Sequence, residues 1–90
     1  MRRNDFSTNC WVDLYESDYF SGRLRRVNGP KKVRQWKAKS LVVGPRTALM
    51  LSIRRRGKES MVKLDPKCVV PDLAESLEGA VIRAAVVCAK

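Results

Sequence analysis

Apolar and polar residues alternate with a period of two along much of the chain, which is typical of β-strands that bury one face. In the segment 10–16, Val12 and Leu14 alternate with Trp11 and Asp13. The sequence predicts further strands, each bounded by turn residues such as glycine, proline or asparagine. Their ranges are 22–29, 31–36, 40–44, 47–53, 59–64 and 67–70.

The last twenty residues are less uniform. The segment 71–79 has an acidic start and a terminal glycine, which predicts one or two helical turns. In the segment 80–88, the alanines favour a helix, whereas the β-branched residues favour a strand. If 80–88 is a strand, the chain holds eight short strands with turn signals at intervals of about 8–12 residues, which predicts an all-β sandwich or barrel.

One hairpin carries more side-chain information than a turn requires. In "WVDLYESDYFSG" (11–22), Tyr15 is followed by Glu16, Phe20 and Gly22. This spacing resembles the first folded hairpin of a βγ-crystallin Greek-key motif. The resemblance implies that Tyr15 and Phe20 stack, that Glu16 is the hairpin carboxylate, and that Gly22 has a positive φ, which glycine tolerates best.

The resemblance extends over most of the chain. The segments 39–51 and 63–73 are similar to the family's junction between motifs and to its approach to a third strand. It implies one all-β domain over 10–90, after a tail at 1–9. Two Greek-key motifs, about 10–44 and 45–89, would form a βγ-crystallin-like β-sandwich with one short helical turn. A generic β-sandwich with an accidental aromatic spacing is the alternative.

The second motif departs from this pattern. Its hairpin, "SIRRRGKES" (52–60), has no aromatic residue and is predicted to be an ordinary tight turn with Gly57 near the tip. We therefore expect the two halves to differ in stability.

Many members of the resembled family bind calcium, which requires about six to eight oxygen ligands. The corresponding stretches here are 35–40 and 76–81, and both lack most of those ligands. The residual candidates are Glu16, Ser40 and Glu78. We therefore expect no metal or other cofactor, with calcium binding absent or weak. Lys39 either places its ammonium where calcium would lie or points to water.

The net charge of +10 is concentrated in the middle of the chain. Residues 23–67 hold 15 basic and 2 acidic residues. Such a field attracts polyanions, although a solvated basic surface that aids solubility is the simpler interpretation. The candidate polyanion-binding residues are Lys32, Arg34, Trp36, Lys37, Lys39, Arg54, Arg55 and Arg56. Trp36 is the only aromatic residue among them, and no nucleic-acid-binding signature is present.

The three cysteines, Cys10, Cys68 and Cys88, are widely spaced, and the chain has no histidine, so a zinc site is not expected. We expect three reduced, buried thiols; one disulfide with a cysteine left over is the alternative. This odd count, and the lack of an apolar segment behind the basic residues of 1–10, favour the cytoplasm. No apolar run is long enough to insert in a membrane, and we expect a monomer rather than an obligate oligomer.

Catalysis is not expected, because no nucleophile–base pair, phosphate-binding loop or metal cluster is present. Asp13, Glu16 and Asp18 are interpreted as solvated hairpin charges. The sequence therefore predicts a non-enzymatic structural or binding domain with degenerate calcium sites. The alternatives are a basic module that binds nucleic acid or another polyanion, and a secreted inhibitor or toxin-like protein, which would need disulfides.

Overall fold

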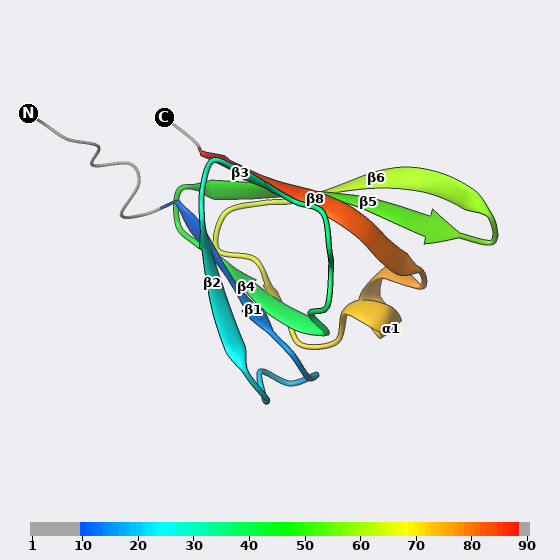
Figure 1. Cartoon of the computed structure of the whole chain (residues 1–90), viewed down its shortest axis with the longest axis horizontal. Helices are drawn as coiled ribbons and strands as arrows, with labels where there is room; N and C mark the ends of the chain where they lie inside the picture. Colours follow the sequence, from blue (N-terminus) through cyan, green and yellow to red (C-terminus); the bar gives the residue numbers. More distant parts are fainter. Residues whose placement is uncertain (1–9, 89–90) are drawn as a thin grey trace, which may run out of the picture.

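Eight strands form two antiparallel sheets that face each other, with one short helix at an open end (Figure 1). The computed structural model describes residues 10–88; the predicted tail, 1–9, lies outside them. The first sheet has the order β2-β1-β4-β7, and the second has the order β3-β8-β5-β6. The elements are β1 (Trp11–Tyr15), β2 (Leu24–Asn28), β3 (Lys31–Val33), β4 (Ser40–Val43), β5 (Thr47–Arg55), β6 (Lys58–Leu64), β7 (Val69–Val70), α1 (Leu73–Leu77) and β8 (Ala80–Cys88).

The two halves of the chain exchange one strand each. β3 comes from the first half but pairs with β8 in the second sheet. β7 comes from the second half but pairs with β4 in the first sheet. Each sheet therefore contains a strand from the other half, and neither half completes a sheet alone.

The core lies between the sheets and follows the predicted alternation. Val12 and Leu14 of β1 are buried, and Leu49 and Leu51 of β5 are fully buried opposite them in the sandwich. Complete burial of such a side chain contributes about 1.5–3 kcal/mol. The remaining large core residues from the strands are Val27, Val33, Leu41, Val43, Ile53, Val70 and Val86.

The ambiguous segment 80–88 is a strand, β8. It pairs with β5 along its length, apart from a bulge beside Ser52 and Ile53, and with β3 on its other side. Partners on both edges satisfy its backbone, and this long-range pairing outweighs the helical preference of its alanines.

The predicted helical segment 71–79 contains α1. Asp72 caps its start by accepting a hydrogen bond from the backbone N–H of Glu75 (3.2 Å). Leu73 and Leu77, four residues apart, are buried on the same side. The helix ends at Glu78, which has a left-handed φ of 53°. Within residues 10–88, no helix has the length and apolar character needed to cross a bilayer.

The strand predicted over 31–36 is shorter than expected, because β3 ends at Val33. Trp36 packs against the core, and its indole N–H donates to the carbonyl of Ala38 (3.0 Å). The chain turns here to cross from the second sheet to the first, so residues 34–36 leave the ladder.

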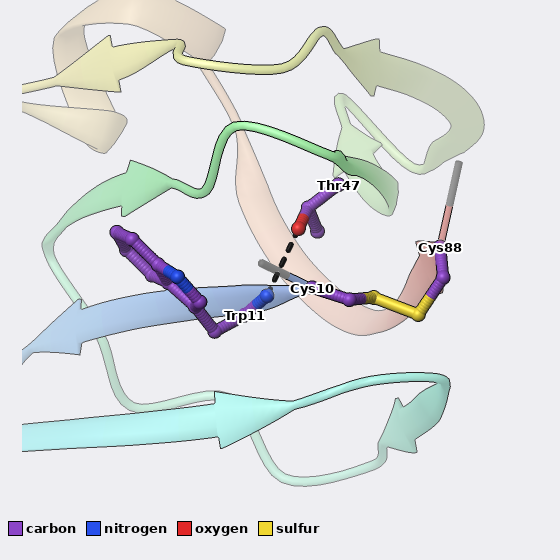
Figure 2. The surroundings of a disulfide bond; sticks show 4 residues. All are labelled: Cys10, Trp11, Thr47 and Cys88. Carbon is purple, nitrogen blue, oxygen red and sulfur yellow. Dashed lines mark hydrogen bonds between the residues drawn. A yellow bond between two sulfur atoms is a disulfide. The ribbon is translucent and has the colours of Figure 1, made fainter. Parts of the chain in front are cut away.

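The expectation of three reduced cysteines was wrong. Cys10 and Cys88 form a disulfide with a Cα–Cα distance of 5.4 Å (Figure 2). Cys68 is free. A 78-residue separation between the bridged cysteines corresponds to about 4.5 kcal/mol in the chain-entropy model. Gly29 lies against this bridge; a Cβ there would be 2.8 Å from the Cys10 sulfur, so any larger residue would displace it.

Candidate functional site

The hairpin between β1 and β2 is folded and fastened by aromatic side chains. The rings of Tyr15 and Phe20 meet edge to face, with centroids 5.5 Å apart and planes at 80°. Gly22 has a φ of 81°, and a Cβ there would lie 2.9 Å from the Ser17 hydroxyl. The predicted aromatic contact and the special glycine are therefore confirmed. The turn also holds Tyr19 at a positive φ (52°), a conformation that a bulky residue adopts only when its surroundings enforce it.

Ser40, the first residue of β4, is the internal anchor of this hairpin. It is fully buried, and its hydroxyl donates to the carbonyl of Ser17 (2.6 Å). The same oxygen accepts a hydrogen bond from the backbone N–H of Phe20 (3.0 Å). The last calcium-ligand position retained in the stretch 35–40 therefore makes two hydrogen bonds inside the fold.

The three residual calcium candidates do not form a cluster. Glu16 is exposed at the start of the hairpin, whereas Ser40 is buried and hydrogen-bonded within it. Glu78 ends α1, in the other half of the chain. Among residues 10–88, no group of three or more histidine, cysteine, aspartate or glutamate side chains could hold a metal ion.

In the second motif, an arginine occupies the equivalent neighbourhood between hairpin and fourth strand. Arg55, at the end of β5, donates through its guanidinium to the carbonyls of Leu77 and Glu78. A cation at this end of α1 satisfies unpaired carbonyls and complements the helix dipole. The stretch 76–81 is therefore held by a fixed positive charge.

The arginines of the β5–β6 hairpin, predicted to bind polyanions together, have different roles. Arg54 lies 3.7 Å from the carboxylate of Glu59. Arg55 binds the end of α1. Arg56 forms the two-residue turn with Gly57, and both have positive φ. The ordinary tight turn predicted at Gly57 is confirmed, and only Arg56 of the three projects from the tip without such a contact.

The other polyanion candidates separate onto two surfaces. Lys32 and Arg34 line a hollow of about 340 Å³ on the outer face of the second sheet; we call it the sheet hollow. Lys37 lines a second hollow, which opens beside the β1–β2 hairpin. Trp36 is half-buried with its indole N–H engaged, so it is not a free stacking platform. Lys39 is exposed, and its backbone N–H donates to the carbonyl of Tyr15 (2.9 Å).

The sheet hollow combines small and flexible apolar residues with cations. Met50 and Ala85 face each other in the pairing of β5 with β8, and Lys32 of β3 is opposite Ala85. Arg83 adds a further cation, although it lies 3.6 Å from Glu59. This surface could receive an anion that has an apolar part.

A second hollow, of about 240 Å³, opens beside the folded hairpin; we call it the hairpin hollow. Leu14, Tyr15 and Ala38 supply its apolar lining, together with the stems of the polar residues. Its polar lining consists of Glu16, Arg23, Arg25, Gln35 and Lys37. Three cations surround one carboxylate here, so the hollow is electropositive.

Two features of the first hairpin were not predicted from the sequence. Asp13 was interpreted as a solvated charge, but it is buried and forms a bidentate pair with Arg26, at 2.6 and 2.9 Å. That carboxylate raises the pKa of Arg26, and the guanidinium lies 4.1 Å from the ring centroid of Trp11. Asp13 and Arg26 are directly opposite in the β1–β2 register, which was the available signal. The second omission was the contribution of Arg23 and Arg25 to the hairpin hollow.

No family model matches the sequence, and no curated protein matches it. A solved structure described as "Evolution of the eye lens beta-gamma-crystallin domain fold" superposes with a TM-score of 0.73. The match covers 91% of this chain and 89% of that chain, with 22% sequence identity. The chain has a βγ-crystallin fold.

This assignment concerns architecture. The βγ-crystallin fold accounts for the two antiparallel sheets and for the aromatic hairpin that the sequence predicted. At 22% identity the likeness carries no ligand or activity with it. Function therefore has to be argued from the side chains of this chain.

Proposed function

We propose that the chain is a non-enzymatic structural or binding domain whose βγ-crystallin fold operates without calcium. The observation that carries the proposal is the commitment of the buried Ser40 hydroxyl to two hydrogen bonds inside the hairpin. This hydroxyl already accepts from the N–H of Phe20 and donates to the carbonyl of Ser17. Turning this hydroxyl toward a metal would break these two hydrogen bonds, at a cost of about 1–3 kcal/mol for each buried polar group left unpaired.

Electrostatics supports the same proposal. Glu16 shares the hairpin hollow with Arg23, Arg25 and Lys37, so a divalent cation would approach one carboxylate and three positive charges. Glu78 lies beside the guanidinium of Arg55, which donates to its carbonyl. Neither carboxylate offers the several convergent oxygens that calcium requires.

The absence of histidine from the whole sequence supports a non-enzymatic role, because a general base near neutral pH is most often a histidine. Cys68 is the one free cysteine in residues 10–88. Burial raises the pKa of its thiol, and the negative charge of Asp65 raises it further. A raised pKa reduces the thiolate that a nucleophile needs.

Thermal unfolding with and without calcium tests this proposal. Millimolar calcium should leave the Tm of the natural chain unchanged, because a ligand stabilises only when its concentration approaches its dissociation constant. The matched variant is Gln35→Asp with Lys39→Ser, which adds a carboxylate and removes an exposed cation. Trp36 is left in place because it packs against the core. Submillimolar calcium binding by the natural chain would overturn the proposal.

A second candidate function is polyanion binding through the sheet hollow. Its support is the grouping of Lys32, Arg34 and Arg83 around one hollow. Of these three cations, only Arg83 forms an ion pair within residues 10–88, with Glu59. A single-stranded oligonucleotide should bind at about 20 mM salt and dissociate as salt is added. Lys32→Gln with Arg34→Gln should weaken binding and flatten the salt dependence.

The matched control for that experiment is Arg46→Gln with Lys58→Gln. Both residues are exposed, form no ion pair within residues 10–88, and lie outside both hollows. Equal weakening by the two double variants would indicate that only net charge matters. If no oligonucleotide binds at low salt, the second candidate function is wrong and the basic residues form only a solvated surface.

The secreted inhibitor or toxin-like class remains a third candidate, since the disulfide that it would need is present in the structure. The bridge also removes one of the two reasons for favouring the cytoplasm, because disulfides persist mainly in oxidising compartments. Titration of thiols under denaturing conditions should give one free thiol per chain. Three free thiols in protein from its native compartment would count against this class.

A further inference from the structure

The hairpin hollow places three cations from two distant segments against one opening. Arg23 and Arg25 come from the edge strand β2 and the residue before it. Lys37 comes from the crossing between β3 and β4, twelve or more residues further along. Within residues 10–88, none of the three forms an ion pair. Three unpaired cations around one hollow repel one another unless an anion lies between them.

The spacing of the two arginines is set by the strand. Residues two apart on a strand point to the same side, with their Cα atoms about 6.5–7 Å apart. Arg25 lies opposite Leu14 in the ladder, and the backbone N–H of Glu16 donates to the carbonyl of Arg23 (3.0 Å). Both guanidiniums therefore extend from a hydrogen-bonded frame. Two guanidinium forks at this spacing can bind different oxygens of one tetrahedral oxyanion.

Trp36 fixes the wall of the hollow that comes from the crossing between β3 and β4. Its ring packs against the core, and its indole N–H donates to the carbonyl of Ala38. Gln35 and Lys37, on either side of Trp36, both line the hollow. The wall thus presents an ammonium and an amide, which are both hydrogen-bond donors.

We infer that the hairpin hollow is a binding site for a multivalent tetrahedral oxyanion, phosphate or sulfate, held by Arg23, Arg25 and Lys37. The inference goes beyond the proposed function, and it is independent of the second candidate, because the hairpin hollow and the sheet hollow share no lining residue. Glu16 is the one group in the lining that opposes such a ligand. Its negative charge lowers the affinity for the oxyanion relative to a purely cationic site. Neutralising Glu16 should therefore raise the affinity, whereas removing an arginine should lower it.

Titration with inorganic pyrophosphate, followed by amide and arginine Nε–Hε resonances, tests the site. The signals of Arg23, Arg25 and Lys37 should shift together with one saturable dependence. Sulfate and orthophosphate, titrated separately, distinguish the two sources of oxyanion by their relative affinities. Chloride at the same ionic strength should not reproduce the shifts, because it cannot bridge two guanidinium forks.

Variants make the test specific. Arg23→Gln with Arg25→Gln should weaken pyrophosphate binding by about tenfold or more, since charge-assisted hydrogen bonds to two forks are lost. Arg46→Gln with Lys58→Gln removes the same charge elsewhere and should change the affinity by less than about twofold at moderate salt. Glu16→Gln should strengthen binding, because it removes the opposing carboxylate. All the substituted side chains are exposed, and unchanged backbone spectra verify the fold.

Equal losses in both double variants, or weaker binding in Glu16→Gln, would overturn the inference. So would shifts that centre on Lys32, Arg34 and Arg83. The two proposals fail separately, because oligonucleotide binding through the sheet hollow can persist in Arg23→Gln with Arg25→Gln, and pyrophosphate binding can persist in Lys32→Gln with Arg34→Gln.

Discussion

The β1–β2 and β5–β6 hairpins are each fastened to the rest of the domain, but by different chemistry. The β1–β2 hairpin is long, bends back on itself, and is fastened by the rings of Tyr15 and Phe20 and by the hydroxyl of Ser40. The β5–β6 hairpin closes with a two-residue turn and extends past the body of the sandwich (Figure 1). Beside its turn, Arg55 fastens it by donating to the carbonyls at the end of α1.

The comparison shows which parts of the motif the fold requires. Both hairpins are tied to the segment that leads into, or begins, the fourth strand of their own half. The side chain that makes this contact differs between the halves: the buried hydroxyl of Ser40 in the first half and the partly exposed guanidinium of Arg55 in the second. The aromatic hairpin leaves a hollow beside it, whereas the tight hairpin leaves free arginine at its tip.

The largest expected effect is on the aromatic contact. Tyr15→Ala should lower the free energy of unfolding by about 2–4 kcal/mol, because it removes a large ring and one half of an aromatic pair. Phe20→Ala should cost less, about 1–2 kcal/mol, because its ring is 37% exposed. Chemical denaturation of both single variants and the double variant gives their coupling. Additive losses would show that the edge-to-face contact contributes nothing.

Ser40→Ala should lower the free energy of unfolding by about 1–3 kcal/mol, since the N–H of Phe20 and the carbonyl of Ser17 lose their partner. Ser52→Ala is the matched control: it is also a buried serine, but its hydroxyl donates only to the sulfur of Met61. Denaturation should give a much smaller loss for the control. Similar losses would indicate that the anchor role of Ser40 is wrong.

Arg55→Gln should destabilise by about 1 kcal/mol, because the last carbonyls of α1 lose a charged donor. Its neighbour Arg54→Gln should change stability by about 0–0.5 kcal/mol, since it loses only an exposed ion pair with Glu59. Amide hydrogen exchange at Leu77 and Ala80 should report faster local opening in the first variant only. Equal exchange in both would remove the distinction between the two arginines.

The smallest expected effect concerns the free thiol. Burial raises the pKa of Cys68, so its neutral form is favoured in the folded state. Its contribution to stability is therefore present below the unfolded thiol pKa and is lost as pH rises through the folded pKa. Alkylation at mildly alkaline pH should be slower in the folded protein than in denaturant. Equal rates in the two states would contradict this.

The sequence sufficed where the determinants are local. The Tyr15, Phe20 and Gly22 spacing predicted a folded aromatic hairpin, and the Gly57 turn predicted a tight one, because turn chemistry acts within a few residues. The period-two pattern predicted an all-β sandwich or barrel, and the resemblance of the first hairpin to a βγ-crystallin motif selected the two-sheet sandwich. The segment 80–88 was ambiguous because its conformation depends on partners in β3 and β5, which lie far away in the chain.

The hollows and the disulfide could not be predicted for the same reason. Cys10 and Cys88 meet only because the start of β1 lies near the end of β8, and cysteine spacing carries no such distance. Likewise, Lys37 joins Arg23 and Arg25 only after the chain crosses between sheets. Charge counting located the basic excess in 23–67 but could not divide it between two surfaces.

Because β3 and β7 are exchanged between the two halves, each half depends on the other to complete its sheet, and one disulfide links the two halves. Arg46 lies exposed between β4 and β5, so cleavage after it divides the chain between its two motifs. Each piece then lacks a strand that only the other can supply, which makes the pieces complementary fragments. The bridge between Cys10 and Cys88 keeps them on one covalent tether, and its reduction turns reassembly from an intramolecular event into a bimolecular one.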